Sequence, residues 1–108
     1  MFDANEKALA LDFARRLSAR DYAAAHTMLS AAARSRTTLD QLQADFERMI
    51  PLDWGDVDPI ALEEGPLWND QFLYVVLGGA VYSEAIMIHA FAVDAGTPGI
   101  DSFEFGRP

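Results

Sequence analysis

Three side chains in this sequence could together carry out acid–base chemistry: Glu84, Tyr22 and Tyr82. A carboxylate in an apolar pocket can remove a proton next to a carbonyl, and tyrosine hydroxyls can stabilise the enolate that forms. The alternative is that Glu84 lies near the solvated end of a hairpin and that both tyrosines are core residues with satisfied hydroxyls. We therefore take these three as candidate catalytic residues, with a packing role as the alternative.

His26 and His89 are the two histidines of the chain. Either could act as a general base, because the pKa of an imidazole lies near neutrality. A dehydratase-like reaction would pair His89 with a carboxylate such as Asp70 or Asp94. The alternatives are a cross-strand or interface role for His89, and a hydrogen bond from His26 to a nearby carbonyl.

The sequence predicts no metal site and no cofactor. There is no cysteine, and two histidines are too few for a zinc site of three or four ligands. The segment "DWGDVD" (Asp53–Asp58) has three carboxylates, but its spacing does not match a calcium loop and Pro59 follows it. We expect a solvated loop there. No phosphate loop, dinucleotide fingerprint or nucleophile elbow is present.

The negative charge is concentrated in the second half of the chain. The net charge is −9, and from Met49 to Pro108 ten acidic residues stand against one basic residue, Arg107. Such a half repels phosphate backbones, which excludes nucleic acid as the expected partner. Solubility is the simpler interpretation, and a surface for a basic protein is the alternative. The N-terminus lacks the order of a signal peptide, so we expect a cytoplasmic protein.

Capping signals and apolar spacing predict three helices in the first half. The first covers Asn5–Ala19, after a capping box that begins at Asp3. The second covers Tyr22–Leu29, and Ser30–Thr37 is interpreted as a connection. The third follows Thr38 and shows the apolar spacing of an amphipathic helix. A proline directly after it, Pro51, ends it.

The second half is rich in glycine, proline, β-branched and aromatic residues, which predicts strands. The expected strands are Val57–Glu63, Leu67–Leu77, Ala80–Asp94 and Ile100–Phe105. The chain is therefore expected to form one α+β domain over residues 1–108. Three helices would pack on a curved, mainly antiparallel sheet of four strands.

The apolar run from Phe72 to Val93 is long enough for a membrane span. A glycine pair, Gly78–Gly79, indicates a two-residue turn instead, and Glu84 would be costly at the centre of a bilayer. The expected hairpin pairs Leu77 with Ala80, and the pairs that follow are Val75 with Tyr82 and Leu73 with Glu84. No membrane association is expected.

This pairing sorts the hairpin into two faces. An aliphatic face, which includes Glu84, suits packing against the helices. The other face is aromatic, and a bulge would exchange the two sets part-way along. An uncovered apolar face of this size usually marks an association surface, and a symmetric dimer is the simplest way to cover it. The expected dimer interface consists of Phe72, Tyr74, Met87, His89 and Phe91.

The segments "ALDFARRLSARDYAAAHTMLS" (Ala10–Ser30), "TTLDQLQADFERM" (Thr37–Met49) and the terminal "SFEFGRP" resemble the nuclear transport factor 2-like superfamily. The resemblance implies a cone-shaped fold with a pocket at its wide end and frequent dimerisation through the sheet. The expected pocket residues are Phe13, Leu17, Tyr22, Phe46, Trp54, Trp68, Ile86 and Ile88.

The superfamily has many functions, so the fold alone does not settle this one. We expect a small dimeric domain that binds a small apolar ligand or a protein partner, without demonstrable catalysis. One alternative is an enzyme resembling ketosteroid isomerase or polyketide cyclases. Another is an acidic, immunity-type protein that binds a basic partner.

Overall fold

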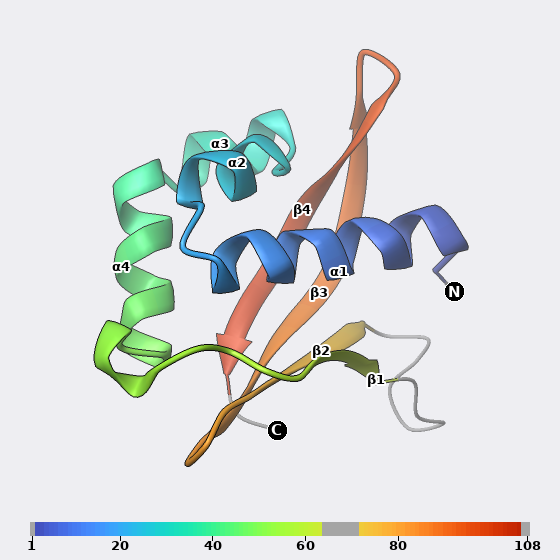
Figure 1. Cartoon of the computed structure of the whole chain (residues 1–108). Helices are drawn as coiled ribbons and strands as arrows, with labels where there is room; N and C mark the ends of the chain where they lie inside the picture. Colours follow the sequence, from blue (N-terminus) through green and yellow to red (C-terminus); the bar gives the residue numbers. More distant parts are fainter. Residues whose placement is uncertain (1, 64–71, 107–108) are drawn as a thin grey trace.

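The computed structural model describes residues 2–63 and 72–106. Helices precede strands along the chain (Figure 1). The elements are α1 (Ala4–Ser18), α2 (Tyr22–Thr27), α3 (Ala31–Arg36), α4 (Leu39–Met49), the 3₁₀ turn η1 (Leu52–Trp54), β1 (Ile60–Glu63), β2 (Leu73–Gly78), β3 (Ser83–Asp94) and β4 (Thr97–Gly106).

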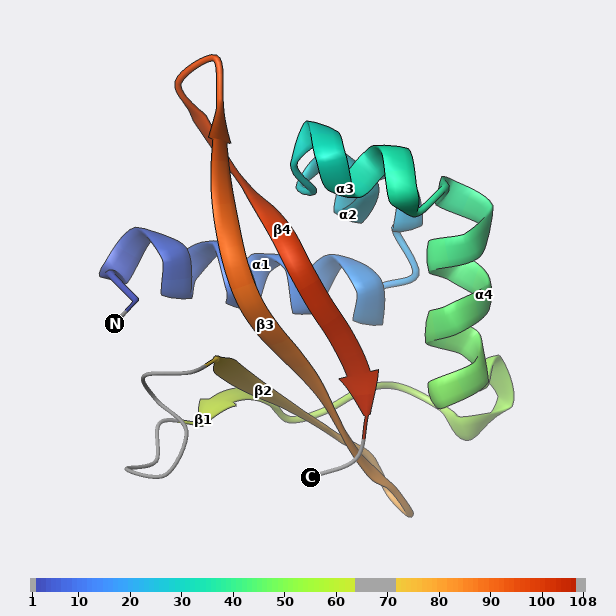
Figure 2. The ribbon, with the colours of Figure 1, turned by 180° about the vertical axis from the view of Figure 1, so that it is seen from behind.

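The four strands form an antiparallel sheet in the order β1-β2-β3-β4. Helix α1 crosses one face of this sheet, and α2, α3 and α4 continue around the same side (Figures 1 and 2). We call the opposite face the outer face; no described helix covers it. The α+β class and the antiparallel sheet are confirmed. None of the described helices is long and apolar enough to cross a membrane.

Each described α-helix begins at a polar side chain that accepts a hydrogen bond from a backbone amide of the first turn. Asp3 and Glu6 form the predicted capping box of α1. The caps of α2, α3 and α4 are Asp21, Ser30 and Thr38. Such side chains satisfy amides that have no partner within the helix.

The prediction of three helices is wrong, because the segment interpreted as a connection contains α3. Ser30 Oγ accepts a hydrogen bond from the amide of Ala33 at 3.1 Å. The run Ala31–Ala33 has high helix propensity, so the signals for a helix start were present in the sequence. With six residues, α3 is a short helix. It is held mainly by its contacts with β4.

The core lies between α1, α4 and the inner face of the sheet. It contains Ala10, Phe13, Ala14, Leu17, Leu42, Phe46, Val75, Leu77, Ile86, Ile88 and Ile100, all fully buried. Phe13 packs edge-on against Phe103, with ring centroids 5.4 Å apart, and Phe46 packs in the same way against Phe105. Edge-to-face pairs of this kind add to the stability that burial gives.

The two-residue turn predicted between β2 and β3 is wrong. Gly78 lies opposite Ser83 and Leu77 opposite Glu84, so the loop covers residues 79–82. The Tyr82 ring lies against Gly79, where a Cβ atom would overlap it, and the Gly79 amide donates to the Tyr82 carbonyl. The register differs from the expected one by four residues. Because side chains alternate with a period of two, an even shift leaves the predicted faces unchanged.

The β3–β4 ladder is irregular between Ile88 and Phe91. Before the irregularity Ile88 faces the core opposite Phe103, and after it Phe91 lies opposite the buried Ile100. The alternation of side chains between the two faces therefore changes on both strands, which is the expected effect of a bulge. Phe91 packs against Phe2 at 5.8 Å on the helix side. The expectation that Phe91 shares a face with His89 is therefore wrong.

Candidate functional site

A groove lies between α3, α4 and strand β4, and we call it the α4–β4 groove. Its volume is about 510 Å³, within the usual range for small-molecule sites. It is lined by Ala33, Arg36, Thr37, Asp45, Arg48, Met49, Asp101, Ser102, Phe103, Glu104 and Phe105. The lining combines apolar groups from β4 and α4 with charged groups of both signs.

Two ion pairs line the α4–β4 groove. Arg36 donates from Nη2 to the carbonyl of Asp101 and lies 3.9 Å from its carboxylate. Arg48 pairs with Asp45 at 3.4 Å, one turn earlier on α4, and its side chain is 78% exposed. Exposed pairs of this kind contribute little to stability. Arg48 can therefore leave Asp45 for a ligand at low cost.

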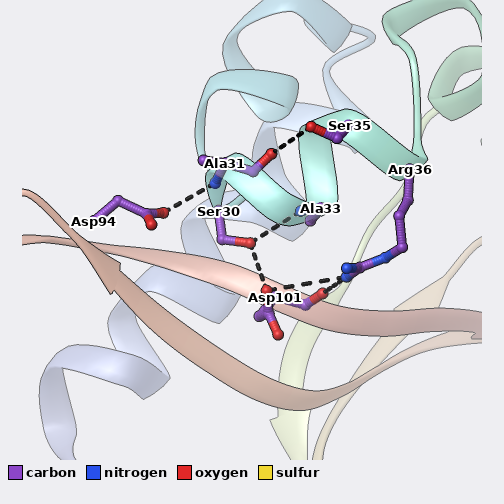
Figure 3. A network of polar contacts seen from close by, with 7 residues as sticks. All are labelled: Ser30, Ala31, Ala33, Ser35, Arg36, Asp94 and Asp101. Atoms are coloured by element: carbon purple, nitrogen blue, oxygen red, sulfur yellow. Dashed lines mark hydrogen bonds and ion pairs between the residues drawn. The ribbon is translucent and has the colours of Figure 1, made fainter.

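A polar network fixes α3, and with it one wall of the groove, to the β3–β4 hairpin (Figure 3). The buried Ser30 donates from Oγ to the Asp101 carboxylate at 2.6 Å. Asp94 accepts a hydrogen bond from the Ala31 amide at 2.9 Å. The start of α3 is therefore bonded to residues from both strands of the hairpin.

A short backbone contact reinforces this attachment. The amide of Ser30 donates to the Ile100 carbonyl at 2.8 Å, and the Ile100 amide donates to the Met28 carbonyl at 2.9 Å. Gly99 lies so close to this segment that a Cβ atom would be 2.9 Å from the Ser30 nitrogen. Glycine is needed here because the opposing atoms belong to the backbone.

Tyr22 belongs to a different cluster, at the ends of α1 and α4. Its hydroxyl donates to Glu47 at 2.8 Å and accepts from Arg20 at 3.2 Å. Burial raises the pKa of Tyr22 above its ordinary value; Glu47 raises this pKa further, and Arg20 opposes both. Arg20 also donates to the Ile50 carbonyl and lies 5.2 Å from the centroid of the Phe46 ring.

Glu84 and Tyr82 lie together at the tip of the β2–β3 hairpin. Glu84 is only 4% exposed. Both residues line a small hollow of about 230 Å³, together with Trp54, Val81 and Ser83. Burial raises the pKa of Tyr82, and its hydroxyl donates to the Asp56 carbonyl at 3.3 Å. Tyr22 is not among the lining residues of this hollow.

The residues expected to line an interior pocket lie mostly in the core. Phe13, Leu17, Phe46, Ile86 and Ile88 are fully buried against one another and their neighbours, and Tyr22 is nearly so. Trp54 instead lies at the surface beside Tyr82. Trp68 lies outside the described residues.

Each histidine has a polar partner that matches the alternative role stated for it above, a backbone carbonyl for His26 and a cross-strand residue for His89. His26 Nε2 lies 2.8 Å from the Thr37 carbonyl, which is the alternative stated for it above. His89 Nε2 lies 2.9 Å from Glu104 on the neighbouring strand. Asp94 is engaged at the start of α3, and Asp70 lies outside the described residues.

Four of the five residues expected at a dimer interface gather on the outer face. The Phe72 ring lies 6.0 Å from Tyr74 and 5.4 Å from His89, and Tyr74 is opposite Met87. The fifth, Phe91, lies on the helix side.

Sequence reasoning missed the α4–β4 groove, although its signals were present. The groove needs α3 as one wall, and the start of α3 is visible in Ser30 and the alanines that follow it. Only the fold could reveal that Phe103 and Phe105 of β4 border Arg36 and Arg48. Within the described part of the chain, no group of histidine, aspartate and glutamate side chains could hold a metal ion.

Comparison of the chain with protein-family models, with curated proteins and with solved structures found no match.

Proposed function

We propose that this protein is a noncatalytic binding domain that holds a small organic anion with an apolar body in the α4–β4 groove. The observation that carries the proposal is the composition of the groove. Phe103, Phe105 and Met49 offer apolar contact area. Arg36 and Arg48 border it, together with three acidic residues that have partners of their own: Asp45, Asp101 and Glu104. Apolar lining with a few placed charges is typical of small-molecule sites.

An anion fits better than a neutral molecule because of the state of Arg48. Its side chain is largely exposed, and Asp45, with which it pairs, is also partly exposed. A ligand carboxylate could take the place of Asp45 and accept two parallel hydrogen bonds from the guanidinium. Arg36 is tied to Asp101, so its role is to hold the wall of the groove.

The proposed fold type is the nuclear transport factor 2-like cone. Support comes from the order of the elements, with helices first and an antiparallel sheet after them, and from α1 crossing one face of that sheet (Figure 1). The proposed ligand site differs from the interior pocket that the resemblance implies. The interior positions hold packed core side chains, whereas the groove is open to a ligand.

The test uses anilinonaphthalene sulfonate, an aromatic anion that fluoresces in apolar surroundings. Ser102→Trp should fill the groove and weaken binding of the probe by about tenfold or more, equivalent to about 1.4 kcal/mol. Thr97→Trp adds the same ring to an exposed position of β4 outside the groove, and should leave binding unchanged. Arg48→Gln should weaken binding of this anion but not of a neutral naphthalene analogue. Equal binding by Ser102→Trp and the unaltered protein would contradict the proposal.

A second candidate function is proton transfer by Glu84, in an enzyme resembling ketosteroid isomerase. The observation that favours it is a buried carboxylate that lines a hollow beside Tyr82. Tyr22, the second expected donor, is bonded to Glu47 and Arg20 instead. Turnover of a β,γ-unsaturated ketone that Glu84→Gln abolishes would support this candidate. Turnover unaffected by that change would remove it.

A further inference from the structure

At the tip of the β2–β3 hairpin, apolar side chains are exposed together. Among the described residues, five large apolar side chains are exposed. Three of them belong to this end of the molecule: Leu52 at 63%, Trp54 at 37% and Val81 at 85%. Single exposed apolar residues are ordinary, but a contiguous group usually marks an interaction surface.

Trp54 and Val81 form one surface with Tyr82 because η1 is packed against the hairpin loop. The rings of Trp54 and Tyr82 lie 5.4 Å apart, and Val81 lines the same hollow as both. Leu52 belongs to the same 3₁₀ turn as Trp54. We call Leu52, Trp54, Val81 and Tyr82 the tip patch.

Hydrogen bonds and close packing hold the two segments of the tip patch, η1 and the hairpin loop, in place. Arg20 donates to the carbonyl of Ile50, and the Trp54 amide donates to Pro51, which fixes η1 at the end of α4. Tyr82 is fixed by its hydrogen bond to Asp56 and by the absence of a side chain at Gly79. A surface ordered before binding loses less entropy when a partner binds.

Acidic residues dominate the exposed charge around the tip patch. Asp53, Asp56 and Asp58 are exposed beside it, and no lysine or arginine occurs anywhere from Met49 to Gly106. Arg20 approaches this end, and its guanidinium is engaged with Tyr22 and two backbone carbonyls. The rim therefore attracts cations and repels phosphate groups.

We infer that the tip patch binds a basic, amphipathic segment of a partner protein. An aliphatic side chain of the partner would cover Val81 and Leu52, and a lysine or arginine would lie over the Trp54 ring or beside the aspartates. Aromatic residues at the centre with charges at the rim are the usual composition of a protein-binding surface. A membrane surface or a nucleic acid does not fit, because both are anionic. This surface is separate from the α4–β4 groove, so the inference does not depend on the proposed ligand.

The test uses two helical peptides of the same pattern, one of leucine and lysine and one of leucine and glutamate. Isotope-labelled protein should bind the lysine peptide, with amide shift changes at residues 52–58 and 79–84. Val81→Ser should weaken that binding by about tenfold. Val81 is almost fully exposed, so its replacement should not alter the fold. Val93→Ser is the matched control, since Val93 is 69% exposed at the far end of β3.

The charge contribution is tested separately. Asp53→Asn combined with Asp56→Asn should weaken binding of the lysine peptide, and salt should weaken it steeply in the unaltered protein. Asp40→Asn, at an exposed position on α4, should not. Three results would each overturn the inference: no binding of the lysine peptide, equal binding by the Val81→Ser and Val93→Ser variants, or equal binding of the glutamate peptide.

Discussion

The guanidinium of Arg20 donates a hydrogen bond of 3.0 Å to the carbonyl of Ile50, thirty positions further along the chain. The same group lies over the Phe46 ring and reaches the Tyr22 hydroxyl. Arg20 itself has a positive φ of 64°, a conformation that disfavours residues with a side chain. The contacts of its guanidinium offset this backbone cost, together with the amides of Arg20 and Asp21, which donate to carbonyls at the end of α1.

Arg20→Ala should lower the free energy of unfolding by about 2–3 kcal/mol, because it removes charged hydrogen bonds and a cation–π contact. Arg20→Gly removes the same contacts but relieves the positive φ, so it should cost about 0.5–1 kcal/mol less. Urea unfolding followed by circular dichroism measures both values. If the glycine variant is the less stable of the two, the backbone argument fails.

Ser30→Ala should lower the free energy of unfolding by about 1–2 kcal/mol. The change removes a helix cap and the hydrogen bond of 2.6 Å that Ser30 donates to the Asp101 carboxylate. Ser35→Ala, on the same helix, removes only an exposed hydrogen bond to the Ala31 carbonyl and should have little effect. Thermal unfolding of both variants tests the difference. Similar losses from both would show that the bonds of Ser30 to Ala33 and Asp101, drawn in Figure 3, contribute nothing specific.

Gly99→Ala should destabilise the protein by about 1–3 kcal/mol, since the added methyl group meets the backbone of Ser30. The comparison is Gly106→Ala on the same strand, where the added group meets the flexible end of Met87. That end can move aside, so the second change should cost less. Chemical denaturation of the pair gives the ranking, and the reverse order would refute the close approach.

The tyrosines predict how stability depends on alkaline pH. Burial raises the pKa of Tyr22, Tyr74 and Tyr82 above 10.0 in the folded protein. The folded state then holds these protons more tightly than the unfolded state does. The contribution of these tyrosines to the free energy of unfolding is therefore fully present below about pH 10. It is lost as the pH rises through their pKa values in the folded protein. Absorbance titration at alkaline pH should give higher midpoints in the native protein than in urea; equal midpoints would exclude the effect.

Dimerisation through the outer face stays a prediction. Light scattering at micromolar concentration should give about twice the 11.9 kDa of one chain. Met87→Glu places a charge between Tyr74 and Glu104 on the outer face, so the variant should be a monomer. Val93→Glu, at the far end of β3, should not. A single-chain mass for the unaltered protein would rule out the dimer at that concentration.

Periodicity predicted the faces of the β2–β3 hairpin better than its turn. The burial of Leu73, Val75, Ile86 and Ile88 follows from alternation alone, which a shift of four residues does not disturb. The turn itself depends on the Tyr82 ring lying over Gly79, a contact that no local propensity describes. The same holds for Phe91, whose face depends on an irregularity that involves a second strand.

The candidate site was less predictable because it joins distant segments. Helix α3 has a local start signal at Ser30, but its length and place depend on Asp94 and Asp101. The pairing of Arg48 with Asp45 is local and could have been read from their spacing. That Arg48 borders the aromatic rings of β4 could not.

The contact between the segment at Leu29 and Ile100 has a consequence for the order of folding. Helix α3 is short, and its start is secured by bonds to the hairpin formed by β3 and β4. During synthesis α3 can therefore take its final place only after β4 has left the ribosome. Closing so long a stretch of chain is slow compared with forming local helices. The nascent chain therefore emerges with one wall of the α4–β4 groove unfinished, and the groove can form only when β4 docks.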